Sequence, residues 1–82
     1  MTHALKTITG FYDSVDKGEK NFEVRKNDRP FMVGDDLLLQ QWNGEEYSGK
    51  ELKRRIIYKL DGGQFGIEKG FVVLGIKEIE NY

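Results

Sequence analysis

The sequence has 82 residues and lacks cysteine, and it holds only one proline and one histidine. Without cysteine there is neither a disulfide framework nor a thiolate metal site. The single histidine, His3, has no cysteine or second histidine beside it, which argues against a metal centre and against a Ser/His/Asp triad. We therefore expect no metal and no cofactor, and stability must come from the apolar core.

Long hydrophobic runs and an excess of one charge are also missing. No apolar segment approaches the roughly 18 to 20 residues that cross a bilayer, and no signal-peptide run is found in the opening residues, MTHALKTITG. The 13 Lys and Arg against 14 Asp and Glu give a net charge of -1, which argues against a bulk positive field but permits a local basic patch. We expect one cytoplasmic domain, residues 1–82, without a membrane partner and of undetermined oligomeric state.

One segment near the start has the period of a helix. Residues 3–6 are expected to form a first strand that ties down the N-terminus. Four apolar residues then recur at the spacing of one helical face: Ile8, Phe11, Tyr12 and Val15. Thr7 or Thr9 is a candidate N-cap, and Gly18 is placed to end the helix in the left-handed conformation. The sequence thus predicts one main helix, packed through this apolar face.

The remaining segments have the period and turn residues of strands. Phe22 and Val24 alternate with polar residues, so we expect them to anchor that strand in the core. The leucines at 37–39 predict a strand covered on both faces, and residues 43–49 predict a hairpin turn. Residues 50–60 favour a long strand over a helix.

A glycine-rich loop and a last core strand complete the chain. The last strand is FVVLGIKEI, residues 71–79, in which Val72, Leu74 and Ile76 alternate. Several short strands, glycine turns and one helix predict an α+β fold. We expect a small pseudo-barrel of five or six mostly antiparallel strands, and a two-layer open sheet is the alternative.

The stretch GEKNFEVRKNDR, residues 18–29, carries seven charges in twelve residues. Glu23 and Arg25 are two apart on a strand, so they project from one face, about 6 to 7 Å apart. They can pair with each other, or Arg25 can present its planar fork to a phosphate or base edge. Lys20 reaches the same place only from a turn after Gly18. A solvated surface with weak ion pairs has the same pattern.

These residues resemble the signature of ASCH domains, a branch of the PUA-like superfamily. The spacing G-x-K-x-x-E-x-R is formed by Gly18, Lys20, Glu23 and Arg25. The turn F-x-V-G-D is formed by Phe31, Val33, Gly34 and Asp35, and the closing strand GFVVLGIK by residues 70–77. The string E-x-R-K-N-D-R, residues 23–29, is most similar to a group of very short ASCH-like proteins of unknown function.

The resemblance implies a small pseudo-barrel with a cleft beside the helix that binds RNA or a modified nucleoside. The implied ligand-binding residues lie in the charged stretch and the turn after it: Lys20, Glu23, Arg25, Lys26, Asn27, Asp28 and Arg29. Some ASCH proteins are amidohydrolases that act on an acylated cytidine. That alternative makes Lys20 and Glu23 catalytic, although those enzymes have threonine where Glu23 stands here. A protein-interaction accessory domain is the third hypothesis.

Two other sets of residues are candidates for contact with a ligand. A row of basic residues that tracks phosphates, or protects an edge strand by charge, is predicted from Lys53, Arg55 and Lys59. Arg54 has the parity of the core residues and is expected to pair with an acid. Trp42 and Tyr47 flank the hairpin turn, where aromatic rings either stack on bases or pack on the neighbouring strand.

Overall fold

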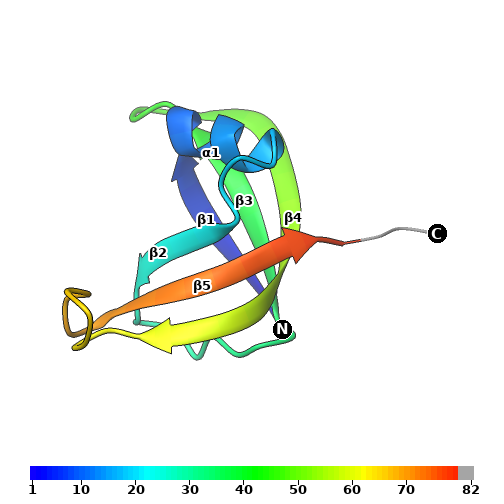
Figure 1. Cartoon of the computed structure of the whole chain (residues 1–82). Coiled ribbons are helices and arrows are strands. Elements are labelled where there is room, and N and C mark those ends of the chain that lie inside the picture. Colours follow the sequence, from blue (N-terminus) through cyan, green and yellow to red (C-terminus); the bar gives the residue numbers. More distant parts are fainter. Residues whose placement is uncertain (80–82) are drawn as a thin grey trace.

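The computed structural model describes residues 1–79 and shows a five-stranded mixed sheet, curled into a half-barrel, with one short helix near the N-terminus (Figure 1). The elements are β1 (Thr2–Ile8), α1 (Thr9–Asp16), β2 (Phe22–Lys26), β3 (Asp36–Trp42), β4 (Tyr47–Asp61) and β5 (Phe71–Glu78). The prediction of an α+β fold of mostly antiparallel strands is confirmed. No helix within residues 1–79 has the length and apolar character needed to cross a membrane.

The strand order in the sheet is β1-β3-β4-β5-β2, so the first two strands of the chain form its two edges. β1 pairs with β3 in parallel, and the other three pairs are antiparallel. α1 lies across one end of the curled sheet (Figure 1) and contacts β1 and β3. The short turn after β3 and the glycine-rich loop after β4 join antiparallel neighbours, whereas β1 and β2 pair with strands distant in sequence.

The core fills the concave side of the sheet. Its buried apolar residues are Leu5, Tyr12, Val15, Phe31, Leu37, Leu39, Ile56, Val72, Leu74 and Ile76. Alternate residues of β3 and β5 supply half of this list because successive strand side chains point to opposite faces. The predicted burial of Val72, Leu74 and Ile76 is therefore confirmed.

The helix uses only half of its predicted apolar face. Tyr12 and Val15 are buried, but Phe11 is exposed, and Ile8 is the exposed last residue of β1. The expectation that all four pack in the core is wrong. The strand runs on to residue 8 because its ladder with β3 continues to Trp42, and the helical phase therefore starts later than predicted.

The prediction for the start of the helix is wrong, and the prediction for its end is confirmed. The N-cap position is Ile8, which makes no side-chain cap. Thr7 instead donates its hydroxyl to Leu5 O at 3.2 Å, so the prediction of a threonine cap is wrong. Gly18 has φ of +78° and its N–H donates to Val15 O at 3.0 Å, which confirms the left-handed C-terminal residue.

The two faces of β2 are opposite to the prediction. Glu23 is only 2% exposed, whereas Phe22 and Val24 are 46% and 52% exposed. The register with β5 is the reason, because Glu23 lies opposite the buried Leu74 and cross-strand partners share a face. The expected apolar anchor is therefore on the outer side, and the charged residues point inward.

A β-bulge in β4 breaks the predicted parity of that strand. Ile56 pairs with Ile76, but the next partner, Gly75, lies opposite Tyr58. Tyr58 is consequently exposed, although strict alternation from Ile56 would place it on the core face. Lys59 pairs with Leu74 and lies on the inner face, so the expected continuous row with Lys53 and Arg55 is interrupted.

Candidate ligand-binding site

The two edge strands approach each other along a seam, defined here as the gap between β1 and β2. Arg25 Nη1 donates to Lys6 O at 3.0 Å, and Nη2 donates to the Thr7 hydroxyl at 3.1 Å. Arg29 Nη1 donates to Ala4 O at 3.0 Å. Arg25 therefore bridges β2 to β1, which share no backbone ladder, and Arg29 adds a second bridge to β1 from the segment after β2.

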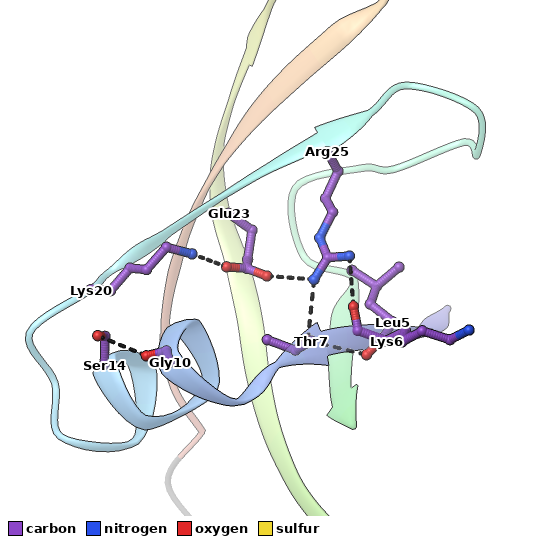
Figure 2. A network of polar contacts seen from close by, with 8 residues as sticks. All are labelled: Leu5, Lys6, Thr7, Gly10, Ser14, Lys20, Glu23 and Arg25. Carbon is purple, nitrogen blue, oxygen red and sulfur yellow. Dashed lines mark hydrogen bonds and ion pairs between the residues drawn. The ribbon is translucent and has the colours of Figure 1, made fainter. Parts of the chain in front are cut away.

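A buried carboxylate lies beside the seam with a cation on each side (Figure 2). Glu23 Oε1 accepts a hydrogen bond from Arg25 Nη2 at 2.7 Å, and Oε2 accepts one from Lys20 Nζ. Lys20 lies before β2, in the turn after Gly18, as the convergence of the three groups requires. Because a buried charge must be paired, the two cations make the burial of Glu23 possible.

The Lys20 ammonium also lies against two aromatic rings. Its Nζ is 5.3 Å from the ring centroid of Phe11 and 5.0 Å from that of Phe22. Both distances are within the range of cation–π attraction. The two exposed phenyl groups therefore form the walls around the charged group.

Together these residues line a cavity of about 390 Å³, which we call the seam pocket. Its lining combines the charged residues Lys20, Glu23 and Arg25 with the apolar side chains of Ile8, Phe11, Phe22 and Val24, and it includes Lys6 and Thr7. Pockets that hold small ligands are commonly about 300–1,000 Å³ and mostly apolar with a few placed polar groups. The seam pocket has this character.

The charged groups of the seam pocket retain unused hydrogen-bond donors. Among contacts within residues 1–79, the Lys20 ammonium uses one of its three protons on Glu23. Arg25 uses three of its five N–H groups, on Lys6 O, Thr7 and Glu23. Donors therefore remain for an incoming ligand without breaking the network.

A second cavity, of about 230 Å³, adjoins the first along the seam, and we call it the basic pocket. Lys6 and Arg25 line both cavities. The basic pocket adds Lys26, Asp28 and Arg29, which belong to the predicted ligand-binding set. Asn27, from the same set, lines neither cavity, and its N–H donates to Gly70 O at 2.8 Å.

The predicted aromatic candidates lie close to the rim of the site. Trp42 and Tyr47 are cross-strand partners. Lys6 Nζ is 4.5 Å from the Trp42 ring and 5.8 Å from the Tyr47 ring. Trp42 and Tyr47 are therefore neighbours of Lys6, which lines both pockets, and the Lys6 ammonium already contacts their rings.

The predicted basic row on β4 lies apart from the site because β5 separates β4 from β2. Arg55 Nε donates to Asp36 Oδ1 at 3.0 Å, and Lys59 Nζ is 3.8 Å from Asp61 Oδ1. The expected acid partner of the buried Arg54 is found, since its Nη2 is 3.7 Å from Glu78 Oε1.

Six residues that line the seam pocket were missed in the sequence: Lys6, Thr7, Ile8, Phe11, Phe22 and Val24. Strand alternation assigned Phe22 and Val24 to the core. The helical spacing of Ile8 and Phe11 assigned them to the core. Lys6 and Thr7 belong to an edge strand whose spatial neighbour, β2, is not its neighbour in the sheet. The sequence carries no local signal for such proximity.

A separate polar cluster fixes the start of β1. The Nε2 atom of the buried His3 is 2.9 Å from Asp35 Oδ2, and Met1 N is 3.3 Å from Oδ1. Met32 N–H also donates to Oδ2, at 3.2 Å. The hydrogen bond with His3 is the largest cause of a lowered Asp35 pKa, followed in the same direction by the N-terminal ammonium. Within residues 1–79 no group of three His, Cys, Asp or Glu side chains is arranged to hold a metal ion.

Comparison with known proteins places the chain in a family. An uncharacterized 12.9 kDa protein in the GpA 3′ region of Escherichia phage P2 is 35% identical over 54 residues, which cover 66% of this chain. The matched region is 50% of the phage protein, so the chain spans about half the length of that relative. The family described as a domain of unknown function, DUF3850, matches residues 2–76. The chain therefore belongs to the DUF3850 family.

Proposed function

We propose that this domain is an ASCH-like member of the PUA-like superfamily and that its seam pocket binds RNA or a nucleotide. One observation carries the proposal: the buried Glu23 carboxylate lies between Lys20 and Arg25 in a pocket walled by exposed phenyl rings. The half-barrel with its helix at one end, and the position of the Lys20, Glu23 and Arg25 motif in that pocket, agree with the resemblance.

The pocket suits a flat heterocycle with a polar edge. The rings of Phe11 and Phe22 offer apolar faces on which a nucleobase can stack. The base edge presents both donors and acceptors. Unused N–H groups of Lys20 can meet its acceptors, and the carboxylate of Glu23 can meet a donor.

The cost of this arrangement to the fold also favours a binding role. A small domain gains stability by burying apolar side chains, yet four of them stand exposed around the seam pocket: Ile8, Phe11, Phe22 and Val24. β2, which carries Phe22 and Val24, also buries the Glu23 carboxylate. Natural proteins break local folding rules most often at functional sites.

The contact between Lys20 and Glu23 bears on the amidohydrolase alternative. The neighbours of Nζ are the Glu23 carboxylate and the rings of Phe11 and Phe22, all of which are partners of a charged ammonium. A charged ammonium lacks the lone pair that a nucleophile or base needs. Binding is therefore favoured over hydrolysis, and an assay for deacylation of an acylated cytidine across pH 6 to 9 checks this choice.

The proposal is tested by fluorescence anisotropy with labelled single-stranded oligonucleotides of each base and with unlabelled mononucleotides as competitors. Phe11→Ala and Phe22→Ala each remove an exposed ring while leaving the arginine bridges intact. Because a base–aromatic stack contributes about 1–3 kcal/mol, each variant should weaken binding about 5- to 150-fold.

Tyr58→Ala is the matched control, since Tyr58 is an exposed aromatic residue of β4 that lines neither pocket. Its affinity should equal that of the wild type, and circular dichroism should show that all three variants are folded. Wild-type affinity in both phenylalanine variants, or no binding of any RNA or nucleotide at millimolar concentration, would refute the proposal. Arg25 is a poor probe because its loss also removes the bridge to β1.

A further inference from the structure

The basic pocket differs in chemistry from the seam pocket beside it. Its lining includes four cations, Lys6, Arg25, Lys26 and Arg29, and one carboxylate, Asp28, which gives a formal charge of 4 − 1 = +3. The whole chain carries a net charge of -1. Charge is therefore segregated to this part of the seam, as is typical of a site for an anion.

Most of these cations are not neutralised by the protein. Within residues 1–79, Lys6, Lys26 and Arg29 form no ion pair with an acidic side chain, whereas Arg25 is paired with Glu23. Arg29 is held by one hydrogen bond from Nη1 to Ala4 O. This anchor orients the guanidinium and leaves four of its five N–H groups for a bidentate contact with phosphate.

The two pockets share Lys6 and Arg25, so a ligand that fills both must be continuous across these residues. A nucleotide has this form, because its base is apolar on two faces and its phosphate is an anion joined to it through the sugar. A phosphate monoester carries about −1.5 to −2 charges at neutral pH. The basic pocket offers the complementary charge beside the stacking site.

We propose that the basic pocket binds the phosphate of the nucleotide whose base lies in the seam pocket. This inference rests on the proposed function and narrows its ligand to a phosphorylated nucleoside, either free or within an RNA strand. A bare nucleoside fills only the seam pocket. The cations of the basic pocket are then phosphate contacts and not merely a solvated surface.

Calorimetric titration with nucleosides, their 5′- and 3′-monophosphates and short oligonucleotides tests the inference. The wild type should bind a monophosphate at least about tenfold more tightly than the same nucleoside, since a hydrogen bond to a charged group contributes about 1.5–3 kcal/mol. The double variant Lys26→Gln, Arg29→Gln should lose most of this gain and bind the nucleoside within twofold of the wild type. Glutamine at position 29 is too short to replace the hydrogen bond from Arg29 Nη1 to Ala4 O, so circular dichroism should show that the double variant is folded.

Lys50→Gln, at an exposed lysine that lines neither pocket, should leave every affinity unchanged. If nucleosides and monophosphates bind equally well to the wild type, the phosphate site is wrong while the proposed function stands. If neither binds, the proposed function itself fails. Two outcomes support the inference and distinguish the source of the phosphate. An oligonucleotide that binds more tightly than any monophosphate identifies RNA as the ligand. Equal binding of oligonucleotide and monophosphate identifies a free nucleotide.

Discussion

A buried carboxylate has to be paired, and Glu23 meets this need with Lys20 on one oxygen and Arg25 on the other. Arg25 in turn holds Lys6 and Thr7 across the seam. The hydrogen bond to Glu23 therefore holds the Arg25 guanidinium in place, and the seam pocket and the bridge from β2 to β1 depend on the same three charges. At this scale the motif spacing predicted the meeting of Lys20, Glu23 and Arg25.

The burial of these residues was not predictable from the chain alone. Phe22 and Val24 alternate with Glu23 in the pattern of a strand that buries its apolar face. Which face points inward is fixed by the partner strand, where Leu74 lies opposite Glu23. A single sequence specifies the alternation but not the register.

Asp35 should give the protein a defined sensitivity to acid. Its pKa is lowered in the folded state, chiefly by the hydrogen bond with His3 and then by the N-terminal ammonium and the Met32 N–H. A lowered carboxyl pKa contributes stability that is complete above the unfolded value of about 3.9 and is lost as pH falls through the folded value. Urea unfolding from pH 7 to pH 2 should show Asp35→Asn to be less stable than the wild type above about pH 4, and the difference should shrink below it.

Asp28→Asn is the control for this measurement, because Asp28 is exposed and forms no ion pair within residues 1–79. Its stability curve should run parallel to that of the wild type. A difference between Asp35→Asn and the wild type that stays constant across the whole range would contradict the role assigned to the carboxylate charge.

At the scale of the elements, position and type were predicted better than orientation. The strands and the helix were found because hydrophobic period and glycine turns are local signals. The bulge in β4 was not predicted, although it turns Tyr58 outward and Lys59 inward. A bulge adds one residue to one strand of a pair, so it is defined by the partner and leaves no distinct local pattern.

Two glycine-to-alanine substitutions, one in α1 and one after β4, should have opposite effects on the free energy of unfolding. In α1, a Cβ on Gly10 would meet nothing within 4 Å, so Gly10→Ala should stabilise the protein by up to about 1 kcal/mol. After β4, a Cβ on Gly62 would clash with Glu68 O and lie 2.7 Å from Phe71 O. Gly62→Ala should therefore destabilise it by about 1–3 kcal/mol or more, as measured by the urea midpoint.

The double variant provides the control, since distant substitutions without shared contacts should add within about 0.5 kcal/mol. A neutral or stabilising Gly62→Ala would mean that the turn between β4 and β5 can relax away from the predicted clash.

At the scale of the whole molecule, the sheet curls until its two edge strands face each other, and both pockets lie where they meet. The half-barrel was predictable from the number of strands and from the resemblance. The juxtaposition of β1 and β2 was not, since neither pairs with the other in the sheet. Of the residues missed in the sequence, Lys6 and Phe11 are among those from the β1–α1 side of this junction, and Phe22 and Val24 come from β2.

This topology has a consequence for the order of folding. β3, β4 and β5 are joined as successive hairpins, whereas β1 and β2 are held at the edges by partners distant in sequence and by side-chain bridges. Contacts between distant segments carry the larger loop-closure cost, so the central hairpins should form in the folding transition state and the edges should dock afterwards.

The kinetics of unfolding and refolding of Leu39→Ala and Leu5→Ala measure that order. Both residues are buried, Leu39 in the central strand β3 and Leu5 in the edge strand β1. Leu39→Ala should slow folding, with φ of about 0.5 or more, and Leu5→Ala should mainly speed unfolding, with φ of about 0–0.3. Equal φ-values would contradict this sequence of events. If the edges dock last, they are also the first to detach, and the seam pocket is the least durable part of the native state.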